Sequence, residues 1–395
     1  MAGNKNLHNA NRAKNDEFYT QFQDIQKEVN AYLEYNENVF KDKIVLLPCD
    51  DPEWSNFTKF FAQNFERFGL KKLISTSYAQ ESKNISKDGD YAITLFEMAS
   101  PKYDPNKTKS HGKIFTLEKD KNKSGRIDIE DLDFEYLEGD GDFRSEEVKK
   151  IRDEADIIIT NPPFSLFREF VAWIMEAKKD FLIIGNKNAI TYKEIFPLIK
   201  GNEMWLGVQS PTDFLNEKKE LSKKLAGLTR WFTNLDHGRR HDPMQLMTMA
   251  DNIKFNKKLK GEEYQKYDNY DAIEVPYTDA IPSDYSEVMG VPITFLDKYN
   301  PDQFEILGLA PERLSENDST LQIKRYRNAI QHKADGSTCS GTKVNDGPTI
   351  LYDGKPSKYP YYTSETVQGK YLQVLYARIL VKWKKGAPGF LGEEK

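Results

Sequence analysis

The fold of this chain is decided by one stretch, Asp156 to Ser165, which reads DIIITNPPFS. Its first half is a short, isoleucine-rich run that does not alternate with polar residues, and such a run predicts a buried strand of a parallel sheet. Two prolines cannot continue a ladder, so we expect the strand to end at Asn161. Residues 165–178 then have apolar side chains at helical spacing, with Ser165 as the expected N-cap. The segment between strand and helix should therefore lie at the carboxyl edge of a sheet, where open α/β folds bind ligands.

The same pattern, an apolar run that stops at a polar turn, recurs on both sides of this stretch. Residues 43–47 and 72–78 form two such runs, joined by an amphipathic helix over 54–68, and residues 181–185 form a third. Further strands are expected at 91–97, 113–118, 134–138, 204–208 and 229–234. The pattern predicts an α/β protein with a mostly parallel sheet, helices on both faces and right-handed crossovers.

The length of 395 residues exceeds what one hydrophobic core usually holds, so we expect two domains. The alternation of strands and helices continues to about residue 235. Beyond it, Pro, Gly, Tyr, Lys and Asp become frequent and only short strands are expected, which predicts a loop-rich second domain over 236–395.

Composition excludes some classes of protein. A net charge of −5 argues against a generally basic nucleic-acid-binding surface, although it permits a local basic face. No apolar run approaches the length of a membrane span, and the first 15 residues lack the apolar core of a signal peptide, so a cytoplasmic location is expected. Cys49 and Cys339 form no CxxC pair and are expected as reduced thiols.

Residues 120–131 resemble a calcium-binding EF-hand loop in their oxygen-bearing side chains and central glycine. The fifth place is a serine and the twelfth an aspartate, and the flanking residues alternate as strands do. A polar hairpin turn closed by Ser124-Gly125 is favoured over a metal site. His237 and His241 have no matching carboxylate pattern, and so no metal is predicted.

Polar side chains follow several of the predicted strands where each strand ends. These residues are Asp50, Thr76, Asp142, Asn161 and Asn186. A carboxylate at a strand end can accept hydrogen bonds from ribose hydroxyls or an adenine amino group, and a neighbouring ring can stack on the base. One such aspartate is more often a turn former, but their recurrence on one edge favours a nucleoside cofactor.

The tetrapeptide Asn161-Pro162-Pro163-Phe164 suits the activation of a poor nitrogen nucleophile. An amine on an aromatic base, or an amide nitrogen, has a delocalised lone pair. If the Asn161 side-chain oxygen and the Pro162 carbonyl both accept hydrogen bonds from that NH₂ group, its lone pair is aimed at an electrophile, here a methyl group on a sulfonium. Proline fixes the direction of the carbonyl, and Phe164 would stack on the planar group. A proline turn with an asparagine cap is the structural alternative.

The tetrapeptide resembles the catalytic motif of the amino methyltransferases that use S-adenosylmethionine, and the whole arrangement resembles the EcoRI-type adenine-specific DNA methyltransferases. The resemblance extends through Asn11 to Thr20, Pro48 to Phe57 and Gly290 to Tyr299, and so covers most of the chain. It implies a Rossmann-like methyltransferase fold in residues 1–235, which would bind S-adenosylmethionine and catalyse transfer, and a target-recognition region in 236–395.

The resemblance also implies the residues of the site. Those expected at the cofactor are Lys14, Phe18, Tyr19, Thr20, Pro48, Cys49, Asp50, Asp51, Thr76, Asp142 and Phe143. Those expected at DNA are Lys187, Asn188, Arg239, Arg240, Lys324, Arg325, Arg327 and Asn328. Each basic cluster could equally be a solvated charged face. The chain departs from the common methyltransferase pattern in its first turn, where Cys49, Asp50 and Asp51 replace glycines.

The function implied is a sequence-specific DNA adenine N6-methyltransferase that flips its target base out of double-stranded DNA. Such an enzyme would be the modification enzyme of a restriction-modification system, with a cognate endonuclease acting separately, and a monomer is favoured. The alternatives are a methyltransferase acting on RNA or on a protein glutamine, or a DNA-binding protein without catalysis. The long C-terminal region favours DNA, and the intact tetrapeptide disfavours loss of catalysis.

Overall fold

The computed structural model describes residues 19–50, 55–79, 100–212, 214–215, 221–222, 227–310 and 324–392. The chain divides into two compact units, Met1–Ala189 with Met204–Gly238 and Ile190–Glu203 with Arg239–Lys395. The division after Gly238 lies close to the predicted boundary, but a segment of the first half joins the second unit. The strand expected at 91–97 lies outside the described residues.

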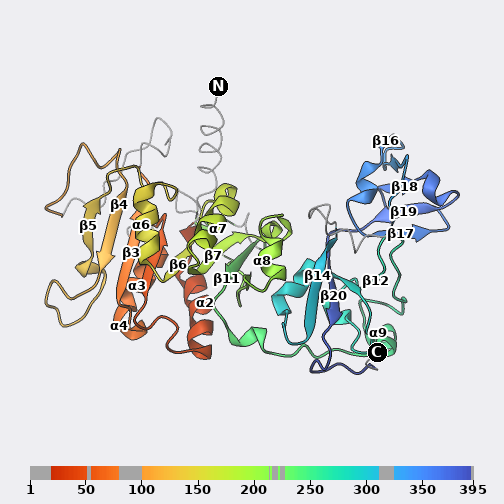
Figure 1. The fold of residues 1–395 in the computed structure, drawn as a ribbon, viewed down its shortest axis with the longest axis horizontal. Helices are drawn as coiled ribbons and strands as arrows, with labels where there is room; N and C mark the ends of the chain where they lie inside the picture. The colour runs from red at the N-terminus through yellow and green to blue at the C-terminus, as the bar shows by residue number, and fades with distance from the viewer. Residues whose placement is uncertain are drawn as a thin grey trace. The chain divides into compact units, whose positions relative to one another are not determined.

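The first unit is built on an eight-stranded sheet with the strand order β5-β4-β3-β2-β6-β7-β11-β8 (Figure 1). The bounds are β2 Ile44–Pro48, β3 Lys72–Ser77, β4 Lys113–Leu117, β5 Asp133–Tyr136, β6 Ile157–Thr160, β7 Asp180–Asn186, β8 Trp205–Leu206 and β11 Thr229–Thr233. The four central strands β3, β2, β6 and β7 run parallel, whereas the pairings towards both edges are antiparallel. The sheet is therefore mixed and only partly parallel.

The order of the central strands creates a topological switch point. From β2 the chain passes to β3 on one side, and it later returns to place β6 on the other side of β2. The carboxyl ends of β2 and β6, at Pro48 and Thr160, therefore lie next to each other. This is the position at which open α/β sheets bind their ligands.

Helices cover both faces of the sheet. They are α2 Phe22–Tyr35, α3 Asn56–Gln63, α4 Phe65–Phe68, α6 Glu146–Glu154 and α7 Phe167–Glu176. Apolar residues of α2 and α3 share one core with Val45 and Ile157, while α6 and α7 contact β2 and β7. In β7, a Cβ at Gly185 would lie 2.5 Å from the ring of Phe167, so only glycine lets α7 approach this closely.

Two predicted helices differ from the observed ones. The helix expected from Ser165 begins at Phe167, after a 3-10 turn η3 (Phe164–Leu166), so Ser165 is not its N-cap. Pro163 is extended, with ψ 123°, and the Leu166 N–H bonds its carbonyl at 2.9 Å, which closes a tighter turn. The helix expected over 54–68 is divided at Asn64, whose side chain donates to the Phe60 carbonyl at 2.8 Å.

The EF-hand-like loop connects β4 to β5, which pair antiparallel as the predicted hairpin requires. Asp120 accepts hydrogen bonds from the backbone of Ser124 and Gly125, and Asp131 accepts them from Lys121, Asn122 and Asp128. Burial opposes ionisation of Asp131, but these backbone bonds outweigh it and lower its pKa. The two carboxylates thus fold the loop onto itself.

Within the described parts of the chain, no group of three or more His, Cys, Asp and Glu is arranged to hold a metal ion. Neither Cys49 nor Cys339 forms a disulfide. No helix among the described residues is long and apolar enough to cross a membrane.

The second unit contains two small sheets, so it is more regular than the loop-rich region predicted. One has the order β12-β13-β20-β14 and the other β16-β15-β18-β19-β17. The bounds are β12 Ile273–Glu274, β13 Met289–Pro292, β14 Phe304–Ala310, β15 Ile330–His332, β16 Thr338–Ser340, β17 Thr349–Tyr352, β18 Tyr361–Thr363, β19 Tyr371–Val374 and β20 Arg378–Trp383, with helices α8 Phe196–Lys200 and α9 Met249–Phe255.

A fully buried carboxylate joins α2 to the segment after β8. Glu28 accepts hydrogen bonds from the backbone N–H groups of Val208 at 2.8 Å and Gln209 at 2.7 Å, and from the Tyr32 hydroxyl at 2.9 Å. Gly207 lies against it, and a Cβ at Gly207 would overlap the Glu28 carboxylate and approach Trp231 to 2.7 Å.

We therefore expect Gly207→Ala to lower the free energy of unfolding by about 2 kcal/mol, because Glu28 cannot move without losing its backbone partners. Urea unfolding measures this. Gly354→Ala is the control, since a Cβ there meets nothing within 4 Å. Equal stability of the two variants would contradict the packing described for Gly207.

Candidate active site

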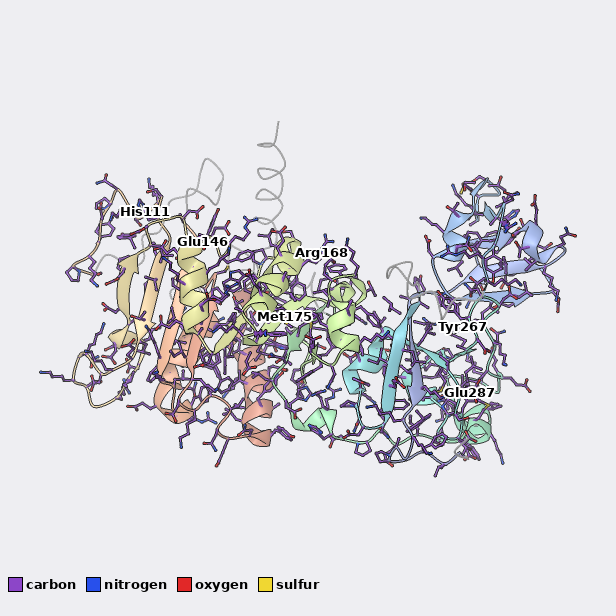
Figure 2. All side chains as sticks on the ribbon, in the orientation of Figure 1. His111, Glu146, Arg168, Met175, Tyr267 and Glu287 are labelled. Atoms are coloured by element: carbon purple, nitrogen blue, oxygen red, sulfur yellow. The ribbon has the colours of Figure 1, made fainter. Side chains whose placement is uncertain are left out.

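The turn after β6 carries the tetrapeptide. Asn161, Pro163 and Phe164 are half-buried and Pro162 is buried. Phe164 packs in part against the core that α2 and α3 share with the sheet. In Figure 2, Arg168 marks the beginning of α7 and Met175 lies near its other end, so the turn lies at the Arg168 end of this helix. The strand-turn-helix setting predicted for Asn161 is confirmed.

The turn after β2 has an unusual backbone. Cys49 adopts φ +68°, the left-handed region in which glycine is favoured. The Asp50 N–H donates to the Thr76 carbonyl of β3 at 2.8 Å, and the Ser75 hydroxyl donates to the Asp50 carbonyl. Cys49 therefore occupies a glycine-like position, held there by bonds from the neighbouring strand.

A buried polar network connects this turn to β6. The Asp50 carboxylate accepts hydrogen bonds from the Ser55 hydroxyl at 2.6 Å and the Thr160 hydroxyl at 2.7 Å. Thr160 Oγ1 also lies 2.6 Å from the carbonyl oxygen of Pro48. Asp50 is 7% exposed and Thr160 is fully buried. Thr160 and Ser55 are not among the residues predicted for the site, although a threonine at the end of a run of isoleucines is a signal that could have identified Thr160.

The segment that follows β5 brings Asp142 to the end of β3. The Ala79 N–H donates to the Asp140 carbonyl at 2.8 Å. Gly141 has φ +82°, and a Cβ there would meet the Ser77 carbonyl at 2.5 Å. Glycine is thus required for this approach. It places Asp142 beside the carboxyl edge of the parallel strands.

Asp142 already has a partner, Arg144, which is not among the residues predicted for the site. Arg144 binds the carboxylate with Nε at 2.9 Å and Nη2 at 2.6 Å. Burial opposes ionisation of Asp142, but the hydrogen bonds and charge of Arg144 lower its pKa. Phe143 is 4% exposed and contacts Phe170 and Trp173 of α7, so most of its ring is used in packing.

Of the cofactor residues predicted near the N-terminus, the structure describes only Tyr19 and Thr20. Lys14, Phe18 and Asp51 lie outside the described residues. Tyr19 and Thr20 form strand β1 (Tyr19–Thr20), which pairs with β9 (Phe214–Leu215). The Asn56 side chain, at the start of α3, donates to the Thr20 carbonyl at 2.8 Å. This bond brings β1 to the helix that follows the β2 turn.

The residues predicted at DNA fall into different surroundings. Lys187 and Asn188 directly follow β7, at the same sheet edge as Asn161, with Lys187 half-buried and Asn188 exposed. In the second unit Arg239 is half-buried, while Arg240 is 6% exposed and donates to Asn202 at 2.6 Å. Arg240 is thus largely engaged inside the protein.

Residues 324–328 lie next to the five-stranded sheet. Lys324 binds Asp268 at 2.8 Å, and Asn328 donates to Glu365 at 2.8 Å. Arg325 and Arg327 are exposed and line an open depression with Glu365 and Thr366. The alternation along this segment turns Lys324 inward and the two arginines outward.

The fold is that of a mixed α/β protein with an Asn-Pro-Pro-Phe turn at the carboxyl end of a central strand, and comparison with known proteins names the family. The model of the adenine-specific methyltransferase EcoRI family matches residues 6–384. The chain belongs to this family, and it is therefore an adenine-specific DNA methyltransferase.

Curated relatives support the assignment over most of their length. The type II methyltransferase M.EcoRI of Escherichia coli is 41% identical over 352 residues, covering 84% of this chain and 98% of the relative. The type II methyltransferase M.MpnI of Mycoplasma pneumoniae is 34% identical, covering 80% and 89%, and M.MgeORF184P of Mycoplasma genitalium is 33% identical, covering 75% and 84%. No solved structure matches.

The family implies S-adenosylmethionine as the methyl donor, and the described residues suit such a group. The edge at the switch point presents the partly exposed Asp142 carboxylate and the half-buried Asn161. Gly141 and Cys49 both have positive φ, so the chain turns sharply at the ends of the strands and leaves backbone groups at this edge. These are groups that bind the hydroxyls and amine of a nucleoside.

The Asp142–Arg144 pair gives a pH-dependent prediction. Because the folded pKa of Asp142 is lowered, the stabilisation is fully present above the unfolded pKa of about 3.9 and is lost as the pH falls through the folded value. Arg144 is half exposed, and solvent screens its charge. We therefore expect Arg144→Gln to lower the free energy of unfolding by only about 0.5–1 kcal/mol at pH 7.

Urea unfolding at pH 7 and at pH 3.5 measures the difference. The difference in the free energy of unfolding between the wild-type protein and Arg144→Gln should be smaller at pH 3.5 than at pH 7. Arg126→Gln, which removes a more exposed partner of Asp128, is the control and should have a smaller effect at pH 7. A gap that is unchanged with pH would show that Arg144 does not act through the Asp142 charge.

Proposed function

We propose that this protein transfers the methyl group of S-adenosylmethionine to N6 of a specific adenine, flipped out of double-stranded DNA. The observation that carries the proposal is the position of Asn161 and Pro162, at the end of the central strand β6 and beside the turn that ends β2. The partly parallel sheet with helices on both faces supports a Rossmann-like methyltransferase fold for the first unit.

The chemistry assigned to the tetrapeptide follows from its backbone. In this proposal Asn161 Oδ1 and the Pro162 carbonyl accept hydrogen bonds from the adenine amine and hold its lone pair toward the electrophile. Pro162 is followed by Pro163, which has φ −54° and ψ 123°, and the two proline rings restrict the backbone that carries the Pro162 carbonyl. Phe164 is anchored in the core and offers its ring to the flipped base. The donor, when bound, supplies the electrophilic methyl group.

The fate of the proton needs no strong base in the protein. The amine nitrogen becomes acidic only after it has gained the methyl group. Its proton can then pass to water by way of the Asn161 side-chain oxygen or the Pro162 carbonyl oxygen. Among the described residues no metal-binding cluster is present, and the proposal requires none. The part of Asn161 is to orient the amine.

The cofactor set proposed around this turn combines the ends of β2, β3 and the segment after β5. In this proposal the backbone of Pro48, Cys49 and Asp50 forms the floor, and the Thr76 carbonyl supports it by accepting the Asp50 N–H. We assign Asp142 to the adenine of the donor. Tyr19, Thr20 and the residues before them are proposed at the methionine end. Asp142 keeps acceptor capacity on Oδ2 while bound to Arg144, because a carboxylate oxygen has two lone pairs.

DNA binding is assigned to Lys187 and Asn188 and to the basic part of the second unit. Residues 324–375 carry eight Lys and Arg and four Asp and Glu, a net charge of +4 in a chain whose total is −5. Duplex DNA attracts such a region through its phosphates. The same unit would hold the base-reading residues, because arginine and asparagine make bidentate contacts to guanine and adenine.

The catalytic assignment is tested with Asn161→Ala. We expect methyl transfer to adenine in duplex DNA to fall by about 10²–10³-fold or more, because one of the two acceptors for the amine is removed. Binding of S-adenosylmethionine, measured by calorimetry, should change little. Asn161→Asp is the matched variant and should retain more activity, since it keeps an acceptor oxygen. Near-wild-type transfer by Asn161→Ala would contradict the role of the side chain.

The substrate is tested by incubating the wild-type protein and labelled cofactor separately with duplex DNA, RNA and a protein extract. Label in N6-methyladenine of DNA is expected. Label confined to RNA or protein would overturn the proposal. Locating the methylated adenines by sequencing then gives the recognition site. An endonuclease from the same cells whose cleavage is blocked by this methylation would identify a restriction-modification pair.

The phosphate contacts are tested with the double variant Arg325→Ala, Arg327→Ala. We expect duplex affinity to fall and the slope of log K against log salt to decrease by about 2, because each phosphate contact releases counterions. Lys258→Ala is the control, since Lys258 binds Asp279 at 2.7 Å and lies outside the basic region. An unchanged slope in the arginine variant would place the DNA elsewhere.

A further inference from the structure

We propose that Asp50 is a positioning residue for methyl transfer: through the hydroxyl of Thr160 it holds the Asn161 turn in register with the turn that ends β2. The inference rests on the proposed role of Asn161. It gives the Asp50 carboxylate a task inside the sheet and assigns it no bond to the donor.

The geometry shows a junction between two strands. Thr160 is the last residue of β6 and the covalent neighbour of Asn161. Its Oγ1 lies 2.7 Å from Asp50 Oδ2 and 2.6 Å from the Pro48 carbonyl oxygen. Pro48 is the last residue of β2, and Asp50 belongs to the turn that follows it. The hydroxyl therefore fixes the place at which Asn161 leaves the sheet relative to the turn after β2.

The Asp50 carboxylate is itself fixed from a third direction. The hydroxyl of Ser55, the N-cap of α3, donates to its other oxygen at 2.6 Å and accepts the Phe57 N–H at 3.1 Å. Ser75 of β3 holds the Asp50 carbonyl. Ser55 and Ser75 are 4% and 0% exposed. The helix after β2, the strand β3 and the catalytic strand β6 thus meet at one residue.

Asp50 could bind the methyl donor or position the Asn161 turn, and the orientation of its side chain favours the second role. A ligand of the donor needs a carboxylate directed out of the sheet edge, but both oxygens of Asp50 accept bonds from buried hydroxyls and the residue is 7% exposed. Misplacing a reacting group by about 1 Å can cost roughly 10²-fold in rate. Loss of this junction should therefore act on the rate of transfer more than on donor binding.

Replacing Asp50 with asparagine removes the negative charge but keeps groups that can form the same hydrogen bonds, so it tests which of the two the transfer requires. In Asp50→Asn, the NH₂ group can donate to Thr160 Oγ1 while the hydroxyl proton of Thr160 goes to the Pro48 carbonyl, and the amide oxygen still accepts from Ser55. The hydrogen bonds to Thr160 and Ser55 survive without the charge. Asp50→Ala removes them, and Thr160→Val removes only the hydroxyl at nearly constant volume.

The experiment measures kcat on duplex DNA and the Kd of S-adenosylmethionine by calorimetry for each variant. We expect Asp50→Ala and Thr160→Val each to lower kcat about 10–100-fold, with Kd within about threefold of wild type. Their combination should fall little below the worse single variant, because both remove one junction. Asp50→Asn and Thr160→Ser keep the hydrogen-bonding groups, so each should lose at least about threefold less kcat than Asp50→Ala and Thr160→Val respectively.

The control is Thr233→Val. Thr233 is another fully buried threonine of the same sheet, whose hydroxyl donates to the Phe181 carbonyl at 2.6 Å. It pairs with Leu182, towards the end of β7 opposite to Asn186. We expect Thr233→Val to lose stability without lowering kcat. Equal losses of kcat in Thr233→Val and Thr160→Val would show a merely structural effect and overturn the proposal.

Other outcomes are also decisive. A rise in donor Kd of more than about tenfold in both Asp50→Ala and Asp50→Asn, with kcat retained at saturation, would make Asp50 a direct ligand. If the fold-losses of kcat in the two single variants multiply in the double variant, Asp50 and Thr160 act independently and the proposal is wrong. If Asp50→Ala does not fold, the comparison of Thr160→Val, Thr160→Ser and Asp50→Asn decides. Failure of the wild type to label DNA would instead defeat the proposed function.

Discussion

The structure depends on the parallel pairing of β2 with β6 in the middle of the sheet. Val45 lies opposite Ile157 and Leu46 opposite Ile158, and all four residues are buried. Because β3 lies on the other side of β2, this pairing creates the switch point and brings two strand ends together. The turn proposed for the donor and the turn proposed for the target amine are thereby neighbours. A shift of one residue in this register would turn every side chain of β6 to the opposite face.

Buried polar groups complete what the apolar strands begin. Glu28 binds the segment after β8, and Asp50 binds Ser55 and Thr160. A carboxylate withdrawn from water is tolerated only when its oxygens are hydrogen-bonded. Each of these carboxylates therefore specifies which segments meet, and neither can be replaced by an apolar residue without leaving donors unsatisfied. The strained turn at Cys49 persists because the same network holds it.

Charge is distributed differently in the two units. The first presents carboxylates and an amide at a sheet edge, which suits a nucleoside. The second carries the excess of basic residues in 324–375, although the total charge of the chain is negative. Some basic residues of the second unit are already paired: Arg378 forms a largely buried pair with Glu274 at 2.6 Å, and Lys324 binds Asp268. Arg325 and Arg327, by contrast, are exposed and offer unburied charge to a phosphate.

The sequence by itself determined the central strands, the turn at Asn161 and the family, because apolar runs, prolines and a tetrapeptide are local patterns. Local patterns also predicted the β4–β5 hairpin. They did not determine the antiparallel flanks of the sheet, the start of α7 at Phe167 or the two sheets of the second unit, since these depend on pairings between distant segments. Nor could they show that Arg144 binds Asp142 or that Asp50 points toward Thr160. Only tertiary structure decides the partner of a carboxylate, because burial and distance set its hydrogen bonds and neither can be read along the chain.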